Sequence, residues 1–283
     1  MSALTICQLE QKATLVRQLI IESLNRAGSG HSAGPLGMTD ILVALYFNVL
    51  NIRPDQPDWE GRDLFVMSNG HYAPALYAVL AERGFFDQQE LNNLRKLGSP
   101  LQGHPERQQV LGLETTSGPL GSGLSQASGM AYVLKYLQSK PHRFVYCTLG
   151  DGELDEGNIW EAVMFAAKYK LDQLIAIVDR NYIQIGGSTE EVMPLENLAD
   201  KWTSFGWHVQ EIDGHNMGSI LNATSLARAT EGQPSVIIAH TTPGKGVDFM
   251  ESDYRWHGKA PNDEQTKQAL IRLQSMDGKL EPC

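Results

Sequence analysis

Short apolar runs alternate with longer amphipathic segments along the chain. Four runs rich in Val, Ile and Leu, and one alternating segment, predict strands at residues 64–67, 144–149, 174–178, 235–239 and 208–212. In the segments between them, and in the one that precedes them, apolar residues recur at helical spacing, as Leu9, Ala13 and Val16 do. Strands that alternate with helices are typical of an α/β fold with a doubly wound, mostly parallel sheet and helices on both faces. We expect one such domain over residues 1–283.

Residues that start and stop helices refine this pattern. Helices are predicted at residues 8–26, 73–83 and 124–137, after Gly157, and from Asn216 to Ala227. Asp87 and Glu90 have capping-box spacing, which predicts a further helix to about Leu97. The four glycines within Gly28–Gly37 predict a loop that passes close to another part of the molecule, with a helix starting only near Thr39.

Polar loops follow two neighbouring strands of the predicted sheet. Gly150-Asp151-Gly152 comes directly after one strand, and Asn181 comes shortly after the next. A right-handed crossover carries the ends of both strands to the same edge of the sheet, so we expect Asp151 and Asn181 to converge there. Two oxygen ligands at one edge favour a hard divalent cation, and the flanking glycines let the backbone approach a diphosphate closely. The sequence therefore predicts a metal–diphosphate site.

Four histidines lie in loops. His31 lies in the glycine-rich segment, His71 follows the first strand, His104 lies in Gly-His-Pro-Glu, and His257 lies in Trp-His-Gly-Lys-Ala-Pro. The loop of His71 leads into a helix, whose N-terminal amides suit an anion. The segment from Gly98 to Gly123 is long for a loop in a compact domain, and such loops are usually functional or disordered. The spacing of the histidines is not that of a transition-metal motif such as HxxxH.

These motifs together resemble those of a known enzyme family. Gly150-Asp151-Gly152 followed by Asn181 resembles the thiamine-diphosphate (ThDP) signature, and the histidine loops resemble the N-terminal part of transketolases. The resemblance covers roughly residues 10–265. Ser32 departs from it, because the family commonly has Pro after the histidine that His31 matches. The fold that the resemblance implies is the diphosphate-binding domain of ThDP enzymes.

The resemblance also implies roles for individual residues. Cofactor contacts are implied for His71, Gly118, Leu120, Gly150, Asp151, Gly152, Asn181 and His257, and metal ligation for Asp151, Asn181 and the carbonyl of Ile183. Catalytic roles are implied for His31, His104, His257 and Glu156, the last at a subunit boundary. The implied cofactors are ThDP and Mg²⁺, with Ca²⁺ and Mn²⁺ as alternatives. Glu153 and Asp155 are interpreted only as acidic residues that favour a helix N-terminus.

The implied activity is that of a transketolase, which moves a two-carbon ketol group from a ketose or its phosphate to an aldose or its phosphate. Full-length transketolases continue into pyrimidine-binding and C-terminal domains. We therefore expect an N-terminal subunit that is active only with a separate C-terminal subunit, in an α₂β₂ assembly. One alternative is the α subunit of a 2-oxoacid dehydrogenase, although that family lacks the Gly-His-Pro-Glu and Trp-His-Gly-Lys-Ala-Pro loops. Another is a non-catalytic partner protein of the same fold. The resemblance does not specify which ketose and which aldose are used.

Composition narrows the classes of partner and the compartment. The 283 residues carry a net charge of -10 with a pI near 5.3, which argues against a nucleic-acid partner. A mean hydropathy of -0.27 and the lack of any 18-residue apolar run argue against a membrane protein. The sequence begins without a basic segment followed by an apolar one, and Cys7, Cys147 and Cys283 form no CxxC pair. We expect a cytoplasmic protein.

Overall fold

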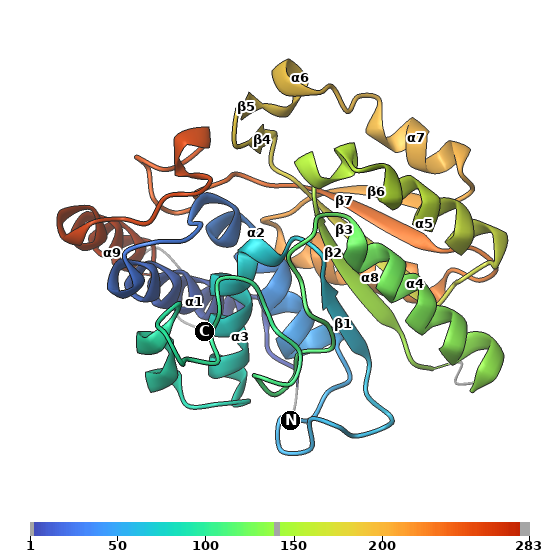
Figure 1. Cartoon of the computed structure of the whole chain (residues 1–283), viewed down its shortest axis with the longest axis horizontal. Helices are drawn as coiled ribbons and strands as arrows, with labels where there is room; N and C mark the ends of the chain where they lie inside the picture. Colours follow the sequence, from blue (N-terminus) through green and yellow to red (C-terminus); the bar gives the residue numbers. More distant parts are fainter. Residues whose placement is uncertain (1–2, 139–141, 278–283) are drawn as a thin grey trace.

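The runs predicted as strands form one sheet in which all neighbouring strands are parallel (Figure 1). The computed structural model describes residues 3–138 and 142–277. The strand order is β1-β2-β3-β7-β6, with β1 at Leu64–Met67, β2 at Val145–Gly150, β3 at Leu174–Arg180, β6 at His208–Asp213 and β7 at Ser235–His240. β2 and β3 are buried at every position, whereas the edge strand β6 is partly exposed. The predicted doubly wound sheet is confirmed.

Helices cover both faces of this sheet and enclose two hydrophobic cores. The helices of the first face are α1 (Ile6–Ala27), α2 (Ala33–Ala44), α3 (Ala73–Arg83), α8 (Met217–Ala229) and α9 (Asp263–Asp277). Those of the second face are α4 (Ser122–Tyr132), α5 (Gly157–Lys168) and α7 (Leu198–Ser204). Successive strand residues alternate between the cores, since Tyr146 and Ile175 lie in the first and Cys147 and Ala176 in the second.

Shorter elements connect these layers. They are the π-helical turns η1 (Leu45–Val49) and η4 (Val133–Leu137), the 3₁₀ turns η2 (Gly70–Tyr72), η3 (Gln88–Asn93), η5 (Gly152–Asp155) and η6 (Tyr254–Trp256), the short helix α6 (Thr189–Val192), and the hairpin strands β4 (Ile183–Gln184) and β5 (Gly187–Ser188). The hairpin and α6 project beyond the carboxyl edge of the sheet, at the top of Figure 1. The chain thus places extra backbone at the edge where the polar loops lie.

The glycine-rich segment differs from its prediction, because α2 begins at Ala33 and not near Thr39. Two of its glycines serve close helix packing. A Cβ at Gly34 would lie 2.2 Å from the Tyr72 ring, and one at Gly37 would lie 3.0 Å from the carbonyl oxygen of Thr242. The composition correctly indicated a close approach, but these two contacts are made from inside a helix and not from a loop.

The prediction of a helix from Asp87 to about Leu97 is also wrong. Only the 3₁₀ turn η3 forms there, and Asp87 accepts a hydrogen bond from the amide of Gln89 instead of completing a capping box. Arg95 then adopts a left-handed backbone conformation with a φ of 60°. Its amide donates to the carbonyl of Leu101, so the chain turns back toward the loop of His104.

Two further observations concern the cysteines and the hydropathy of the helices. Cys147 is buried and its thiol is free, whereas Cys283 lies outside the described residues. In the part of the chain that the structure describes, no helix has both the length and the apolar character that are needed to cross a membrane.

Candidate functional site

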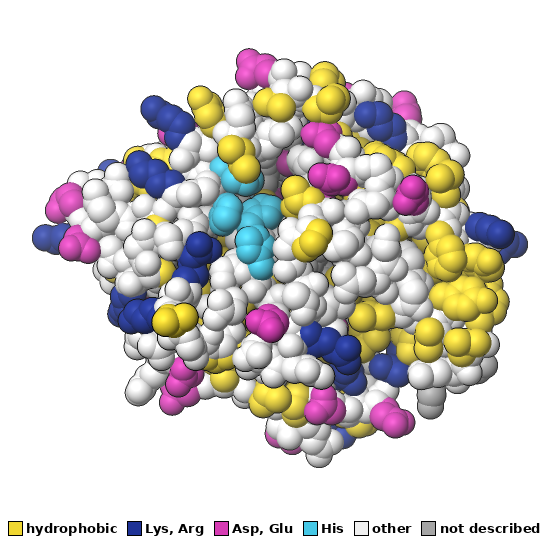
Figure 2. All heavy atoms as spheres, in the orientation of Figure 1, with side chains coloured by type: hydrophobic (Ala, Val, Ile, Leu, Met, Phe, Trp, Pro, Cys, Tyr) yellow, Lys and Arg dark blue, Asp and Glu magenta, His cyan; other side chains and the backbone are white. Residues whose placement is uncertain are grey.

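A cavity of about 320 Å³ lies at the carboxyl edge of the sheet. Figure 2 shows its mouth as a hollow beside a cluster of histidines. Its lining residues are His31, His71, Tyr72, His104, Gly118, Leu120, Gly150, Asp151, Gly152, Glu153, Ile183, Gln184, Ile185 and His257. The structure therefore brings together nearly all of the site residues predicted from sequence. Asn181 lies directly behind this lining, in contact with Tyr72, and Glu156 lies outside it.

Asp151 is the most buried carboxylate that lines the cavity, with 1% of its surface exposed. Its Oδ2 accepts from the Tyr182 amide at 2.7 Å and from Arg180 at 3.1 Å, and its Oδ1 accepts from the Gly152 amide at 2.8 Å. Burial, followed by the negative charge of Asp179, nevertheless raises the pKa of Asp151 to about 7. A positive charge in the cavity would favour the ionised form, so this carboxylate suits a cation.

Asn181 is oriented by buried partners that were not predicted from the sequence. Its side-chain nitrogen donates to Asp179 Oδ2 at 2.7 Å and to the Tyr72 hydroxyl at 2.8 Å. This arrangement assigns the other end of the amide as oxygen, which accepts from the Ile183 amide at 3.0 Å and retains a second lone pair. Asp179 is fully buried and also accepts from Thr241. A charged residue at the end of an apolar strand was the signal that could have identified it.

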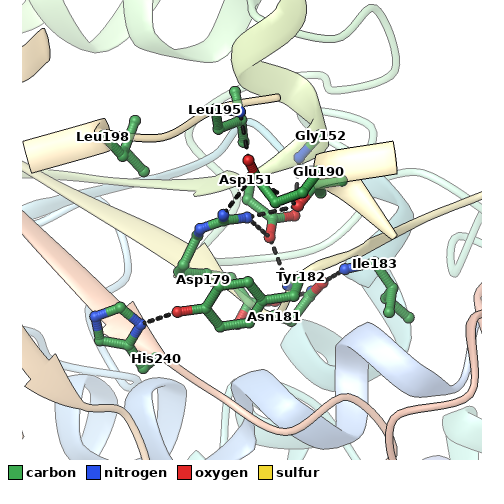
Figure 3. A network of polar contacts seen from close by, with 12 residues as sticks. Asp151, Gly152, Asp179, Asn181, Tyr182, Ile183, Glu190, Leu195, Leu198 and His240 are labelled. Carbon is green, nitrogen blue, oxygen red and sulfur yellow. Dashed lines mark hydrogen bonds and ion pairs between the residues drawn. The ribbon is translucent and has the colours of Figure 1, made fainter. Parts of the chain in front are cut away.

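Arg180 supplies the buried positive charge of this region. Its guanidinium is paired with Asp151, with Glu190 at 2.7 Å and with Glu196 at 2.7 Å, and Figure 3 labels Asp151 and Glu190. It also lies 4.1 Å from the centre of the Tyr182 ring. Because three carboxylates share one guanidinium, the region has an excess of negative charge that a divalent cation would offset.

The residues present fit a divalent cation and a diphosphate. The Asp151 carboxylate, the Asn181 amide oxygen and the Ile183 carbonyl are hard oxygen donors, as Mg²⁺ and Ca²⁺ require. In the described part of the chain, no group of three or more His, Cys, Asp or Glu is arranged to hold a metal. Gly150 and Gly152 both line the cavity, so their backbone is within reach of a diphosphate bound there.

Glu153 lies at the centre of the loops around the cavity, which corrects its interpretation as a helix-terminal charge. Only 2% of its surface is exposed. Its carboxylate accepts from Ser68, from the Gly121 amide at 2.7 Å and from the Gly150 amide at 3.0 Å. Burial raises its pKa in spite of these bonds. Glu153 therefore ties together three loops that come from distant parts of the sequence.

The four loop histidines converge on the mouth of the cavity. Ring centroids lie 5.0 Å apart for His31 and His71, 5.2 Å for His71 and His257, and 6.5 Å for His31 and His104. Burial, and then the neighbouring cationic groups, lowers the pKa of His31 to about 4, and burial also lowers the pKa of the other three. At neutral pH all four are uncharged imidazoles, each able to donate one hydrogen bond and accept one.

This cluster predicts a component of acid sensitivity. Because the folded-state pKa of His31 is depressed, the unfolded chain binds more protons between pH 6.5 and about 4, and stability falls as the pH drops through that window. We expect His31→Gln to lose less stability than wild type on going from pH 7 to pH 5, by about 1–2 kcal/mol. Urea unfolding at both pH values measures this difference. The exposed His142, replaced by Gln, is the control, and equal pH dependence in wild type and His31→Gln would contradict the prediction.

Two exposed charged residues, Glu156 and Arg95, are absent from the lining of the cavity. Glu156 is exposed at the N-terminus of α5, so its predicted place at a subunit boundary stays a prediction. Arg95, for which no role was predicted from the sequence, is exposed and lies near His31 and His104. Its positive charge contributes to the lowered pKa of both His31 and His104, and its Nε donates to Ser29 at 3.0 Å. An anionic group on a ligand would therefore find a cationic partner at the cavity mouth.

Comparison with known proteins gives consistent matches. Residues 9–278 match the family model described as transketolase, thiamine diphosphate binding domain. The chain is 43% identical over 266 residues to the 6-deoxy-6-sulfo-D-fructose transketolase subunit SqwG of Clostridium sp. (strain MSTE9), covering 94% of this chain and 96% of that protein. It is 42% identical to one of the subunits of the apulose-4-phosphate transketolase of Phocaeicola vulgatus, covering 96% of each.

A solved structure gives the same picture at the level of the fold. The transketolase of Campylobacter jejuni superposes with a TM-score of 0.89 and 34% identity. The match covers 98% of this chain and 46% of that one, so this chain spans less than half of the solved enzyme. By contrast, it spans nearly the full length of the two subunit relatives.

Proposed function

The chain belongs to the transketolase family, and on that premise we propose that it is the N-terminal subunit of a ThDP-dependent transketolase whose remaining domains lie on a separate chain. The observation that carries the proposal is the gathering of Asp151, the Asn181–Ile183 segment and four neutral histidines around one cavity. The proposed reaction transfers a two-carbon ketol group from a ketose to an aldose. When bound, ThDP supplies the electron sink for breaking and forming the carbon–carbon bond.

Different residues of this chain are proposed to bind the cation, the diphosphate, the sugar and the rings of the cofactor. Asp151, Asn181 and the Ile183 carbonyl are proposed to hold a divalent cation, Mg²⁺ by preference, that neutralises the diphosphate. His71 lies in η2, immediately before the N-terminus of α3, and is assigned to the diphosphate end. His104 is more exposed and is assigned, with the other two histidines, to the sugar hydroxyls. Gly118 and Leu120 contribute backbone to the cavity wall, where the rings of the cofactor are proposed to lie.

The two ends of the cavity can be told apart by mutation. We expect His104→Ala to lower kcat by about 10²-fold or more with a small change in ThDP affinity, because it removes a hydrogen bond to the reacting sugar. His71→Ala is expected to weaken ThDP binding first. Calorimetric titration with ThDP and Mg²⁺, beside steady-state kinetics of the complete enzyme, measures both effects. Equal loss of ThDP affinity in the two variants would refute the division of roles.

The alternative functions receive less support. The relatives and the solved structure carry transketolase names, which does not favour a 2-oxoacid dehydrogenase component. A non-catalytic partner protein would have no need for a buried carboxylate with a raised pKa beside an open cavity. Direct titration with ThDP and Mg²⁺ decides between these alternatives, since a scaffold without cofactor would show no Mg²⁺-dependent binding.

A partner subunit has a candidate docking surface on α4, η4 and α5. We call it the α4–α5 face and define it by the exposed apolar residues Val133, Tyr136, Leu137, Met164 and Phe165. Rings of Tyr132, Tyr136 and Phe165 connect its two halves, and the patch is visible on the right of Figure 2. Apolar patches of this kind mark interfaces. We propose that the C-terminal subunit covers this face.

The proposed assembly is an α₂β₂ heterotetramer, because closed two-fold symmetry is the commonest way to repeat an interface. Its proposed compartment is the cytoplasm. Glu156 lies at the start of α5, one of the helices of the α4–α5 face, which supports its proposed position at a subunit boundary. Light scattering of the co-expressed pair tests the stoichiometry. A fully active particle with the mass of one copy of each chain would exclude the tetramer.

The proposed substrates are sugars that carry an anionic group. The two subunit relatives are named for a sulfo sugar and a sugar phosphate, and Arg95 lies exposed at the cavity mouth beside His31 and His104. The test is a ketol-transfer assay of the reconstituted enzyme with matched pairs of ketoses, with and without a phosphate or sulfonate. Equal kcat/KM for charged and neutral members of a pair would refute an anionic preference.

A further inference from the structure

Hydrogen bonds between three side chains connect the Asn181–Ile183 segment to strands β7 and β6. We call Tyr182, His240 and Glu211 the clasp. Tyr182 Oη lies 2.7 Å from His240 Nδ1, and His240 Nε2 lies 2.9 Å from Glu211 Oε2 (Figure 3 shows the first contact). A carboxylate can only accept, so Nε2 donates to Glu211, and in that tautomer Nδ1 accepts from the tyrosine hydroxyl.

The clasp ends on a residue in an unfavourable backbone conformation. Tyr182 has a φ of 66°, in the left-handed region that side-chain-bearing residues rarely adopt. Its amide donates to Asp151 Oδ2 at 2.7 Å, and its carbonyl accepts from the Thr189 amide at 3.0 Å. Such a conformation persists only where the surroundings hold it. The turn at Tyr182 joins Asn181, which lies behind the cavity, to Ile183, which lines it.

The clasp connects this turn to rigid parts of the sheet. The Arg180 guanidinium lies over the Tyr182 ring, 4.1 Å from its centre, and the His240 ring lies at its hydroxyl end, with centroids 5.9 Å apart and ring planes inclined by 16°. Arg180 ends β3 and is paired in register with His240, which ends β7, and Glu211 belongs to β6. Three adjacent strands therefore hold one ring at their shared edge.

We propose that the clasp positions the cation ligands: it keeps the turn at Tyr182 in the conformation that presents Asn181 and Ile183 to a divalent cation at Asp151. The clasp residues are positioning residues, and none of their side chains lines the cavity. The inference rests on the proposed metal–ThDP function. Without the clasp, the cation would have to order this turn on binding, and its apparent affinity would fall by the fraction of chains in which the turn is unformed.

The test measures the Mg²⁺ dependence of ThDP binding by calorimetry, on the chain in complex with its partner subunit. Tyr182→Phe removes one hydrogen bond of the clasp, whereas His240→Phe removes both, and each variant retains an aromatic ring at its position. Each is expected to raise the apparent Kd for Mg²⁺ about two- to tenfold. The double variant is expected to have the same apparent Kd for Mg²⁺ as the more affected single variant. The reason is that both substitutions remove the hydrogen bond between Tyr182 and His240. Saturating Mg²⁺ should restore ThDP affinity, which a general loss of stability would not allow.

A second pair of variants examines the backbone conformation. Tyr182→Ala loses the clasp and keeps the cost of the left-handed turn, whereas Tyr182→Gly loses the clasp and relieves that cost. The Gly variant should therefore bind Mg²⁺ more tightly than the Ala variant. Lys170→Ala, at another left-handed position away from the cavity, is the matched control and should leave the Mg²⁺ dependence unchanged.

The outcomes separate this inference from the function on which it rests. If wild type shows Mg²⁺-dependent ThDP binding and the Phe variants match it, or if their effects add in the double variant, the clasp has no positioning role. Equal Mg²⁺ affinity in the Ala and Gly variants would also overturn it. If wild type shows no Mg²⁺-dependent ThDP binding, the proposed function fails, and the clasp inference fails with it.

Discussion

Replacing Asp151 by Asn is expected to weaken Mg²⁺-dependent ThDP binding by at least about a hundredfold, since loss of groups that merely orient a metal ligand already costs about 10–100-fold. Asp151 is the charged member of the proposed ligand set, and it lies at a site where Arg180 is already shared among three carboxylates. An amide oxygen at position 151 can still ligate, but it carries no negative charge for the cation. The cation and the diphosphate would then have to bind without that charge.

The fold should survive this substitution, because Asn has nearly the same size as Asp and creates no cavity in the core. Circular dichroism and the urea midpoint of the variant report on this. Asp200→Asn, at an exposed position on α7, is the matched control and should bind ThDP as wild type does. Calorimetric titration with ThDP at several Mg²⁺ concentrations measures the affinities. Wild-type affinity in Asp151→Asn would show that the cation is held elsewhere.

The sheet could be predicted because it follows from the pattern of apolar residues along the chain. The convergence of the Asp151 and Asn181 loops could be predicted because crossovers between parallel strands are right-handed. Apolar runs such as Leu174–Val178 are too long and too continuous for a half-exposed strand, so they indicate a parallel sheet buried on both faces. The right-handed crossover then fixes which strand ends share an edge. Local sequence and handedness suffice for this level of the structure.

Contacts between distant side chains could not be predicted in the same way. Glu153 has the composition of a helix-terminal acid, and only the fold brings Ser68 and the Gly121 amide to its carboxylate. Asn181 is fixed by Tyr72, which lies 109 positions away in the sequence. The helix start at Ala33 is a case of packing overriding composition, because the glycine that suggested a loop, Gly34, is needed against a ring of another segment.

The isolated chain is expected to show no ketol transfer, with a rate at least about a hundredfold below that of the chain with its partner subunit. The reason is the open state of the cavity in this chain. Ligand sites of this kind bury most of the ligand, whereas here Leu120 and Ile185 line the cavity with 39% and 79% of their surfaces exposed. The exposed position of His104 at the same mouth leaves one side without protein. We therefore expect a second chain to complete the enclosure.

The α4–α5 face allows this dependence to be tested within one experiment. Met164→Glu places a charge in the proposed interface and is expected to abolish both assembly and activity, because an unpaired charge would be buried there. Leu226→Glu makes the same kind of change at an apolar residue of α8 that is 52% exposed, on the opposite face of the sheet, and should leave both unaffected. Mass photometry measures assembly, and chromatography of the sugar products measures transfer.

Two outcomes of this experiment count against different parts of the proposal. Robust turnover by the isolated chain, shown by mass spectrometry to be free of any partner, would refute the two-chain enzyme. Full assembly of Met164→Glu would instead place the interface elsewhere, because a buried unpaired charge on the α4–α5 face should not be tolerated. The need for a partner and the surface that binds it are therefore separated.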